Sequence, residues 1–278
     1  MTDEVETAVC APSRQNNQSL RILVTGAAGA VGSHVIEAML QRGHKVRGLD
    51  LHTPRVAVEE FRTSLTDLPG LRAAACGVDA IVHTAGVPER HEFAASLVPH
   101  NIVGTHNVFE AARLEGVKRV VNTSSVRVVG GLDWGSGKIG LEAGFVPGDH
   151  YGVSKVTGEV IGEMYARRFG IAVVSVRLGW FVRNRKEAEA MASMPMGKRI
   201  YISHDDAKDF YVRAVEQPGI DHAVAYVTSF NEGDSAFDLE PARKNFGYSP
   251  KDSFPSGSTW SESEDFPSPL IGPSLAPQ

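Results

Sequence analysis

The chain has 278 residues, of which 42% are hydrophobic and 22% charged, and its formal net charge is -5. This composition is typical of a globular protein with a sizeable core, enough for one large domain. The basic clusters are short, which argues against nucleic acid as a main partner. No apolar run is long enough to span a bilayer, so we expect no membrane partner.

Both ends of the chain are polar. The acidic first residues do not resemble a signal peptide, and the two cysteines, Cys10 and Cys76, lack metal-ligand spacing. These observations suit a reducing compartment, and we expect a cytoplasmic protein. Residues 1–18 and the Ser- and Pro-rich residues 255–278 are predicted to be flexible tails.

Between the tails, short apolar runs alternate with segments of helical periodicity. Strands are predicted, in chain order, at 20–25, 45–50, 61–64, 80–83, 119–123 and 172–177. Helices are predicted at 31–41, 69–75, 98–115 and 151–169. This alternation predicts an α/β fold with a doubly wound parallel sheet that helices cover on both faces.

A glycine-rich turn follows the first predicted strand. The segment TGAAGAVG, residues 25–32, places glycines at three-residue intervals. A tight turn and a backbone that approaches a pyrophosphate both need residues without a Cβ atom, and the helix that follows offers N–H donors. Glycine triplets also make ordinary turns, but the flanking strand and helix favour a dinucleotide. The predicted cofactor contacts here are Gly26, Ala28, Gly29, Ala30, Val31 and Gly32.

Asp50 ends the second predicted strand. An acidic side chain at this place accepts hydrogen bonds from ribose hydroxyls and repels a 2′-phosphate, which favours NAD over NADP. Arg55 lies close by and weakens this preference, and the alternative for Asp50 is an ordinary turn residue. Asp67 and Leu68 either frame the adenine, or Asp67 caps the helix at 69–75.

The segment from Ser203 to Asp206, sequence SHDD, invites a metal-site interpretation. It fits a helix start better, with Ser203 as the N-cap and Asp206 three residues later. No further ligands stand in register with it, so we expect no metal.

The segment DHYGVSK, residues 149–155, places Tyr151 and Lys155 four residues apart at the start of a predicted helix. Positions i and i+4 share one face of a helix. The two residues are either an ordinary surface pair or a phenol that a neighbouring ammonium makes reactive. The pair alone does not decide between these interpretations.

Seven segments together resemble the extended short-chain dehydrogenase/reductase family, the NAD-dependent epimerase/dehydratase group. They are TGAAGAVG (25–32), Asp50, TDL (66–68), HTAG (83–86), NIVGTHNVFEAA (101–112), VNTSSVRVVG (121–130) and YGVSK (151–155), in the family's order. The resemblance implies a Rossmann-type NAD-binding domain at 19–180 that includes the catalytic residues. A small substrate-binding region would then occupy residues 181–254.

The resemblance also implies the chemistry. Tyr151 would be the general base and acid, Lys155 would contact the nicotinamide ribose, and Ser125 would donate to the substrate oxygen. A free tyrosine has a pKa of about 10, and a neighbouring ammonium together with a cationic nicotinamide ring favours its ionised form. Tyr151 would remove a hydroxyl proton while hydride passes from the same carbon to NAD.

Further cofactor residues follow from the resemblance alone. They are His83, Ala85, Gly86, Asn101 and Thr123. His83 is expected to pack beside the cofactor rather than to act as an acid or base, and Gly86 would let the backbone approach it. Asn101 either orders the active-site region or is a polar residue near a helix start.

Three classes of function remain: a dehydrogenase that releases NADH, a nucleotide-sugar epimerase or dehydratase that reuses it, and a non-catalytic NAD-binding protein. The family's dehydratases carry an Asp-Glu pair where this chain has Val126 and Arg127. Its epimerases usually have a larger C-terminal region, and an inert binder would not need all three catalytic residues. We therefore expect an NAD-dependent dehydrogenase of a sugar or sugar acid, most similar to uronate dehydrogenases.

The expected substrate pocket departs from that of uronate dehydrogenases. Those enzymes have Asn-His at Val126-Arg127 and serines at Pro88 and Trp180, so this pocket is expected to be more apolar. Their carboxylate-binding arginine has no clear counterpart, and the candidates are Arg183, Arg185, Lys186 and Arg199. The alternative for the basic residues at 183–186 is a solvated helix face. The substrate candidates are Pro88, Ser125, Val126, Arg127, Trp180, Arg183 and Arg185.

Assembly is implied by the resemblance only. Members of the family commonly dimerise through the helices that correspond to 98–115 and 151–169. A homodimer is therefore expected.

Overall fold

The computed structural model describes residues 19–88, 91–135 and 137–258. The predicted tail at 1–18 and most of the one at 255–278 lie outside these ranges. Residues 255–258 lie inside them and are bound to the rest of the chain. The Tyr201 hydroxyl donates to the Ser256 carbonyl at 2.8 Å, and the His204 N–H donates to the Ser258 Oγ at 3.0 Å.

A seven-stranded sheet forms the centre of the molecule, with strand order β3-β2-β1-β4-β5-β6-β9. Every neighbouring pair of strands is parallel. The strands are β1 (Arg21–Thr25), β2 (Lys45–Asp50), β3 (Glu59–Arg62), β4 (Ala80–His83), β5 (Arg119–Ser125), β6 (Ala172–Leu178) and β9 (His222–Val227). The order reverses beside β1, where an open α/β sheet forms a crevice at the carboxyl ends of its strands.

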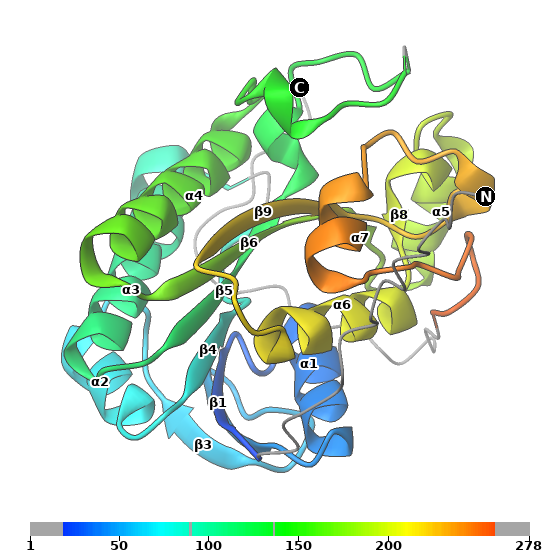
Figure 1. Cartoon of the computed structure of the whole chain (residues 1–278). Helices are drawn as coiled ribbons and strands as arrows, with labels where there is room; N and C mark the ends of the chain where they lie inside the picture. Colours follow the sequence, from blue (N-terminus) through cyan, green and yellow to red (C-terminus); the bar gives the residue numbers. More distant parts are fainter. Residues whose placement is uncertain (1–18, 89–90, 136, 259–278) are drawn as a thin grey trace, which may run out of the picture.

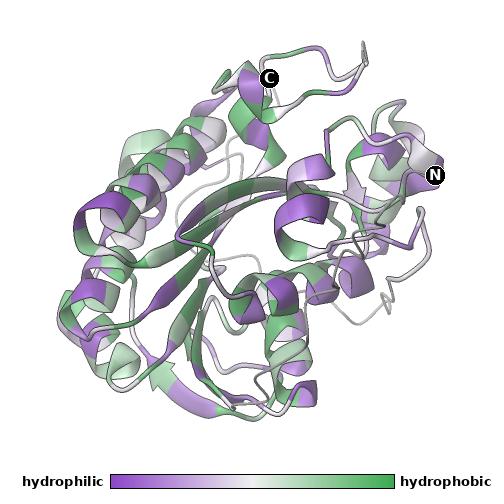
Figure 2. Cartoon of the chain, viewed as in Figure 1, coloured by the Kyte–Doolittle hydropathy of each residue, from purple (hydrophilic) through white to green (hydrophobic). Residues whose placement is uncertain are grey.

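Helices cover both faces of this sheet (Figure 1). On one face lie α1 (Ala30–Gln41), α6 (His204–Glu216) and α7 (Glu240–Phe246), and on the other lie α2 (Leu68–Ala75), α3 (Gly104–Leu114) and α4 (His150–Phe169). Successive strand residues point to opposite faces. In β1, Ile22 and Val24 pack in the core beside α1, whereas Leu23 packs in the core beside α3. Both faces of the inner strands are buried, and Figure 2 shows hydrophobic residues on these strands and a hydrophilic edge strand β3.

The predicted alternation of strands and helices is confirmed, and so is a doubly wound parallel sheet. One strand of the central sheet was not predicted: β9 adds to the edge of the sheet beside β6. It lies within the region 181–254, so the predicted boundary at 180 does not coincide with a boundary in the sheet. The rest of that region holds the short pair β7 (Trp180–Phe181) and β8 (Tyr201–Ile202) and the helix α5 (Arg185–Ser193).

The helix predicted at 98–115 begins earlier in the structure. A wide-turn helix, η1 (Phe93–Val103), leads directly into α3. Pro99 lies inside η1 and has no N–H to donate to the preceding turn. In the sequence a proline is typical of a helix start, so no local pattern shows that the helix extends before Pro99.

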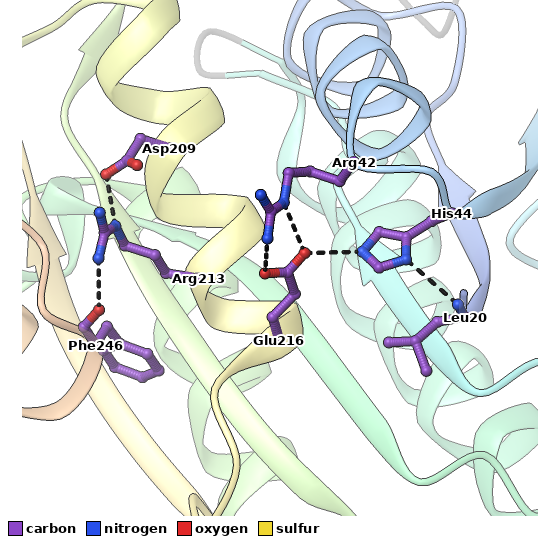
Figure 3. Close-up of polar contacts among 7 residues, drawn as sticks. All are labelled: Leu20, Arg42, His44, Asp209, Arg213, Glu216 and Phe246. Atoms are coloured by element: carbon purple, nitrogen blue, oxygen red, sulfur yellow. Dashed lines mark hydrogen bonds and ion pairs between the residues drawn. The ribbon is translucent and has the colours of Figure 1, made fainter. Parts of the chain in front are cut away.

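The predicted helix start at Ser203 is confirmed, since its Oγ accepts from the Asp206 N–H at 2.9 Å. The other end of α6 is held by charges (Figure 3). Glu216 accepts from Arg42 Nε at 2.9 Å and from His44 Nε2 at 3.1 Å, while the Leu20 N–H donates to His44 Nδ1. These contacts fix α6 against the end of α1.

The described helices include none that is both long and apolar enough to cross a membrane.

The buried face of α6 gives the first testable prediction. Phe210 is fully buried and lies 5.3 Å from the Phe246 ring and 5.2 Å from the Tyr248 ring. Phe210→Ala should lower the free energy of unfolding by about 3–5 kcal/mol, because the cavity cannot close completely. Urea denaturation measures this change.

The matched control is Phe230→Ala, since the Phe230 side chain is 51% exposed. This variant should lose less than about 0.5 kcal/mol. Equal losses in the two variants would show that α6 does not share the core of the sheet.

Candidate active site

The glycine turn after β1 leaves no room for a side chain at Gly26 or Gly32. Gly26 has a φ of +74°, and a Cβ atom there would lie 2.6 Å from the Ala85 nitrogen. A Cβ atom at Gly32 would lie 2.0 Å from the Gly26 carbonyl oxygen. The helix α1 starts at once, with Gly29 as an N-cap that offers no side chain to its first N–H groups. Backbone donors and a helix N-terminus at one place form a cradle that suits a pyrophosphate.

Asp50 stands beside this turn at the end of β2. Its Oδ2 accepts from the Ala28 N–H at 3.1 Å, and its Oδ1 accepts from the His52 N–H at 3.0 Å. The carboxylate is therefore fixed where the ribose hydroxyls of a dinucleotide would need an acceptor.

A cavity of about 360 Å³ opens at the carboxyl ends of these strands. Its volume is within the range of small-molecule sites. The predicted residues that line it are Gly26, Ala28, Gly29, Ala30, Val31, Gly32, Asp50, Ala85, Gly86, Pro88 and Arg183. Residues that the sequence did not single out also line it: Leu49, Leu51, His52, Thr63, Ser64, Leu65, Thr84, Val87 and His100.

Asp67 and Leu68 do not line the cavity. Asp67 caps α2, because its Oδ1 accepts from the Gly70 N–H at 3.2 Å. A hydrogen bond from Thr63 at 2.6 Å, followed by the one from Gly70, lowers the pKa of this carboxyl. Leu68 borders a second, open hollow of about 420 Å³ beside α2. Thr63 and its two successors line the cavity instead, and their position just past the end of β3 was the available signal.

Tyr151 and Lys155 lie on the first turns of α4. The Lys155 Nζ donates to the Thr123 carbonyl at 2.9 Å and lies 5.5 Å from the centre of the Tyr151 ring. Desolvation of its ammonium lowers the pKa of Lys155 to about 8, and the negative charge of Glu159 opposes this effect. The ammonium is therefore near its titration point just above neutral pH.

The structure connects this lysine to the cavity. A Cβ atom at Gly86, a cavity residue, would lie 3.6 Å from the Lys155 Nζ and 3.3 Å from the Asn101 Oδ1. The Asn101 side chain accepts from the Val87 N–H at 2.7 Å and donates to the Val87 carbonyl at 2.9 Å. Asn101 lies well inside η1, so it is not a helix-start residue, and it fixes the backbone beside Lys155.

Ser125 ends β5 and begins the next turn. Its Oγ accepts from the Arg127 N–H at 3.2 Å, which caps the short helix η2 (Val126–Val129). The strand residue two positions earlier, Thr123, binds Lys155 through its carbonyl and the Tyr211 hydroxyl through its Oγ1 at 2.7 Å. The same strand end therefore carries Ser125 and anchors the lysine.

His83 is buried between two hydroxyl groups. The Thr25 Oγ1 lies 2.7 Å from its Nδ1, and the Thr105 Oγ1 lies 3.1 Å from its Nε2. Burial, followed by the charge of Lys155, lowers the pKa of His83 to about 3. His83 therefore stays neutral at physiological pH, which suits packing rather than acid–base chemistry.

A buried ion pair that the sequence did not reveal supports this arrangement. Glu159 lies one helical turn after Lys155 and pairs with Arg177 of β6 at 3.0 Å. It also accepts from the Ser124 hydroxyl at 2.5 Å, and Arg177 donates to the Tyr226 hydroxyl at 2.8 Å. The helix α4 is thus tied to β5 and β6. The spacing of Tyr151, Lys155 and Glu159 on one helix face was the available signal.

The proposed substrate residues have diverse surroundings. Val126 is buried in a core cluster, and Trp180 is partly buried between two clusters. Arg127 pairs with Asp149, whose other oxygen accepts from the Gly152 N–H and so caps α4. Arg185 is largely exposed and pairs with Glu189 at 3.2 Å. Of the residues predicted only as substrate contacts, Pro88 and Arg183 line the cavity.

No group of three or more potential metal ligands occurs within the described parts of the chain.

The glycine turn yields a prediction about binding. Gly32→Ala should weaken NAD binding at least about tenfold, because the turn must move and its N–H groups lose their alignment. Titration of NAD by calorimetry measures the loss. Gly158→Ala is the control, since its Cβ would lie no closer than 3.5 Å to Asn122 and Thr105. Unchanged NAD affinity in Gly32→Ala would contradict the assignment of this turn.

Comparison with known proteins agrees with this geometry. The model of the NAD dependent epimerase/dehydratase family matches residues 22–194. The chain is 32% identical over 237 residues to a uronate dehydrogenase of Pseudomonas putida, with 84% of each chain covered. It is 31% identical over 248 residues to an L-arabinose 1-dehydrogenase (NAD(P)(+)) of Haloferax volcanii, with 84% of this chain and 96% of the relative covered.

Solved structures show the same fold. A mutant uronate dehydrogenase from Agrobacterium tumefaciens, complexed with NAD, matches with a TM-score of 0.74 at 28% identity. The match covers 84% of this chain and 86% of that one. The chain therefore belongs to the NAD-dependent epimerase/dehydratase family, and it is an enzyme that uses NAD.

Proposed function

We propose that this enzyme is an NAD-dependent dehydrogenase that oxidises a hydroxyl of a sugar or sugar acid. The observation that carries the proposal is the position of the Lys155 Nζ. It donates to the Thr123 carbonyl, lies 5.5 Å from the centre of the Tyr151 ring, and would lie 3.6 Å from a Cβ atom at Gly86, which lines the cavity. The names of the relatives, a uronate dehydrogenase and an L-arabinose 1-dehydrogenase, support the substrate class. The second name also supports C1 as the carbon that is oxidised.

Tyr151 is the proposed base. Its phenolate removes the proton of the substrate hydroxyl, and the nearby Lys155 ammonium favours the ionised phenol. The Ser125 hydroxyl donates to the substrate oxygen and keeps it in line with Tyr151. NAD, when bound, supplies the hydride acceptor. An ammonium has three N–H donors, and Lys155 directs one of them to Thr123.

The proposed contacts for the pyrophosphate are Gly26, Gly29 and Gly32, and the proposed contact for the ribose is Asp50. The fixed carboxylate of Asp50 favours NAD over NADP, because it would repel a 2′-phosphate. The region 181–254 is proposed to determine the substrate. Arg127 lies two residues after Ser125 and pairs with Asp149. Arg127 is therefore a candidate to bind an anionic substrate only if its ion pair with Asp149 breaks. A cytoplasmic location stays a prediction from the sequence.

The mechanism predicts the effect of single substitutions. Tyr151→Phe should lower kcat/KM by roughly 10²–10⁴-fold, the usual contribution of a general base. Lys155→Met should also lower it, because the phenolate loses the neighbouring charge. The measurement is NADH absorbance with NAD and a panel of aldoses, hexuronates and polyols.

Tyr165→Phe is the control on the same helix. The Tyr165 hydroxyl donates to Glu110 at 2.8 Å and belongs to the core beside α3, so turnover should be retained. Full turnover of Tyr151→Phe would contradict the mechanism. No NADH from any substrate, with NAD bound tightly, would favour an internal redox cycle of the epimerase type.

A homodimer through η1, α3 and α4 is also proposed. Several apolar side chains on these helices are exposed: Val103, Leu114, Val153 and Val160, at 37–49%. Val153 and Val160 are seven residues apart, so they lie on one face of α4. Figure 1 shows α3 and α4 along the same side of the molecule. A second copy would bury this face.

The proposed dimer can be tested by placing one charged side chain in its interface. Val160→Asp should convert the dimer to a monomer, because the carboxylate would be desolvated without a partner. Leu40→Asp, on α1 at the opposite face of the sheet, should leave the dimer intact. Light scattering after size-exclusion chromatography gives the masses. A monomeric wild-type chain, or a dimeric Val160→Asp variant, would contradict this interface.

A further inference from the structure

Arg183 is the residue whose position the reaction does not explain. It follows β7, in the region 181–254, yet it lines the same cavity as the glycine turn and Asp50. Among the described residues of that lining, it is the one with a permanent positive charge. The sequence offers it as a substrate contact, whereas the cavity places it with the cofactor residues.

Aromatic contacts fix the segment that carries Arg183 against α1. The Phe181 ring packs edge-on against His34 of α1 at 5.4 Å and stacks on His204 at 4.5 Å. The His204 Nε2 donates to the Val182 carbonyl at 2.8 Å. His34 lies one turn into α1, and its Nδ1 is 2.8 Å from the Ala30 carbonyl. Residues 181–183 are therefore attached beside the N-terminal turns of the helix that begins at the glycine turn.

The guanidinium is also oriented. The Arg183 Nε donates to the Glu187 Oε1 at 2.7 Å, and the Arg183 N–H donates to the Glu187 Oε2 at 2.9 Å. A second guanidinium nitrogen, Nη2, pairs with the same carboxylate. A guanidinium has five N–H donors, so this pair leaves others to serve an anion. The Arg183 side chain is 44% exposed, which allows it to adjust to a ligand.

A bound dinucleotide would concentrate negative charge in the cavity, which a positively charged side chain such as Arg183 would offset. A dinucleotide brings two negative charges on its pyrophosphate, and the Asp50 carboxylate adds a third at the same cavity. The first turn of α1 supplies partial positive charge only. Arginine matches phosphate oxygens with paired, charge-assisted hydrogen bonds.

We propose that Arg183 binds the pyrophosphate of NAD and so joins the C-terminal region to the cofactor site. Its role deepens the NAD site and does not depend on which substrate is oxidised. In this arrangement the glycine turn binds the pyrophosphate through backbone N–H groups, and Arg183 binds it through its guanidinium. Arg183 is then a cofactor contact and not the receptor of a substrate carboxylate.

The test is a set of binding titrations on the full chain with NAD, ADP and adenosine. Arg183→Gln should raise the Kd for NAD and for ADP about tenfold or more, the loss expected for a charged hydrogen bond. Its Kd for adenosine should stay unchanged, because adenosine has no phosphate. Arg183→Lys should recover part of the affinity. Arg185→Gln is the matched control, since Arg185 pairs with Glu189 and does not line the cavity.

Two results would overturn the proposal. One is an unchanged Kd for NAD and ADP in Arg183→Gln. The other is an equal loss with adenosine, which would show that the substitution disturbs the site as a whole. These titrations need no turnover, so their failure is distinct from a failure of the proposed dehydrogenase reaction. If that reaction is observed, a raised KM for hexuronates at saturating NAD in Arg183→Gln, with an unchanged Kd for NAD, would assign Arg183 to the substrate instead.

Discussion

The hydrogen bond from Lys155 to the Thr123 carbonyl is the contact on which the site depends. It joins the helix that carries Tyr151 to the strand that ends at Ser125, so this one contact links the elements of the phenol, the ammonium and the hydroxyl. One turn further along α4, the buried pair between Glu159 and Arg177 fixes the same helix to β6. Removing one partner of such a pair leaves an uncompensated buried charge, which is strongly destabilising. The fold and the site are therefore stabilised by the same contacts.

Close packing of the backbone determines which residues can form the glycine turn, the proposed cofactor-binding part of the site. Gly26 and Gly32 lie so close to neighbouring backbone that no side chain fits at either position. The closeness that excludes side chains also exposes backbone N–H groups at the start of α1. Asp50 then fixes the turn through Ala28. The proposed catalytic residues and the proposed cofactor residues meet at Gly86 and Val87, beside which Asn101 binds the backbone.

Much of the fold was predictable because strands buried on both faces appear in the sequence as short apolar runs. The glycine turn, Asp50 and the Tyr151–Lys155 spacing were predictable because each depends on local sequence. β9 was missed because a six-residue apolar run far from any motif gives little signal. The start of η1 was misplaced because a proline inside a wide-turn helix looks like a proline at a helix start.

The rest of the site depends on tertiary contacts that no local pattern encodes. Val126 follows Ser125 directly, yet it turns into the core, while Arg127 pairs with the cap of another helix. Arg183 reaches the cofactor cavity because Phe181 packs on α1, more than 140 residues earlier in the chain. Likewise, Glu159 lies on α4, whereas its partner Arg177 lies on β6.

Transfer of hydride from the hydroxyl-bearing carbon of the substrate to NAD is tested most directly by following an isotope. An aldose or hexuronate with deuterium at C1 would be incubated with the enzyme and NAD, and the products examined by NMR. The proposed reaction predicts deuterium at C4 of the released NADH and none in the oxidised sugar. Deuterium that stays in a sugar product, with no NADH released, would contradict a dehydrogenase and show an internal redox cycle.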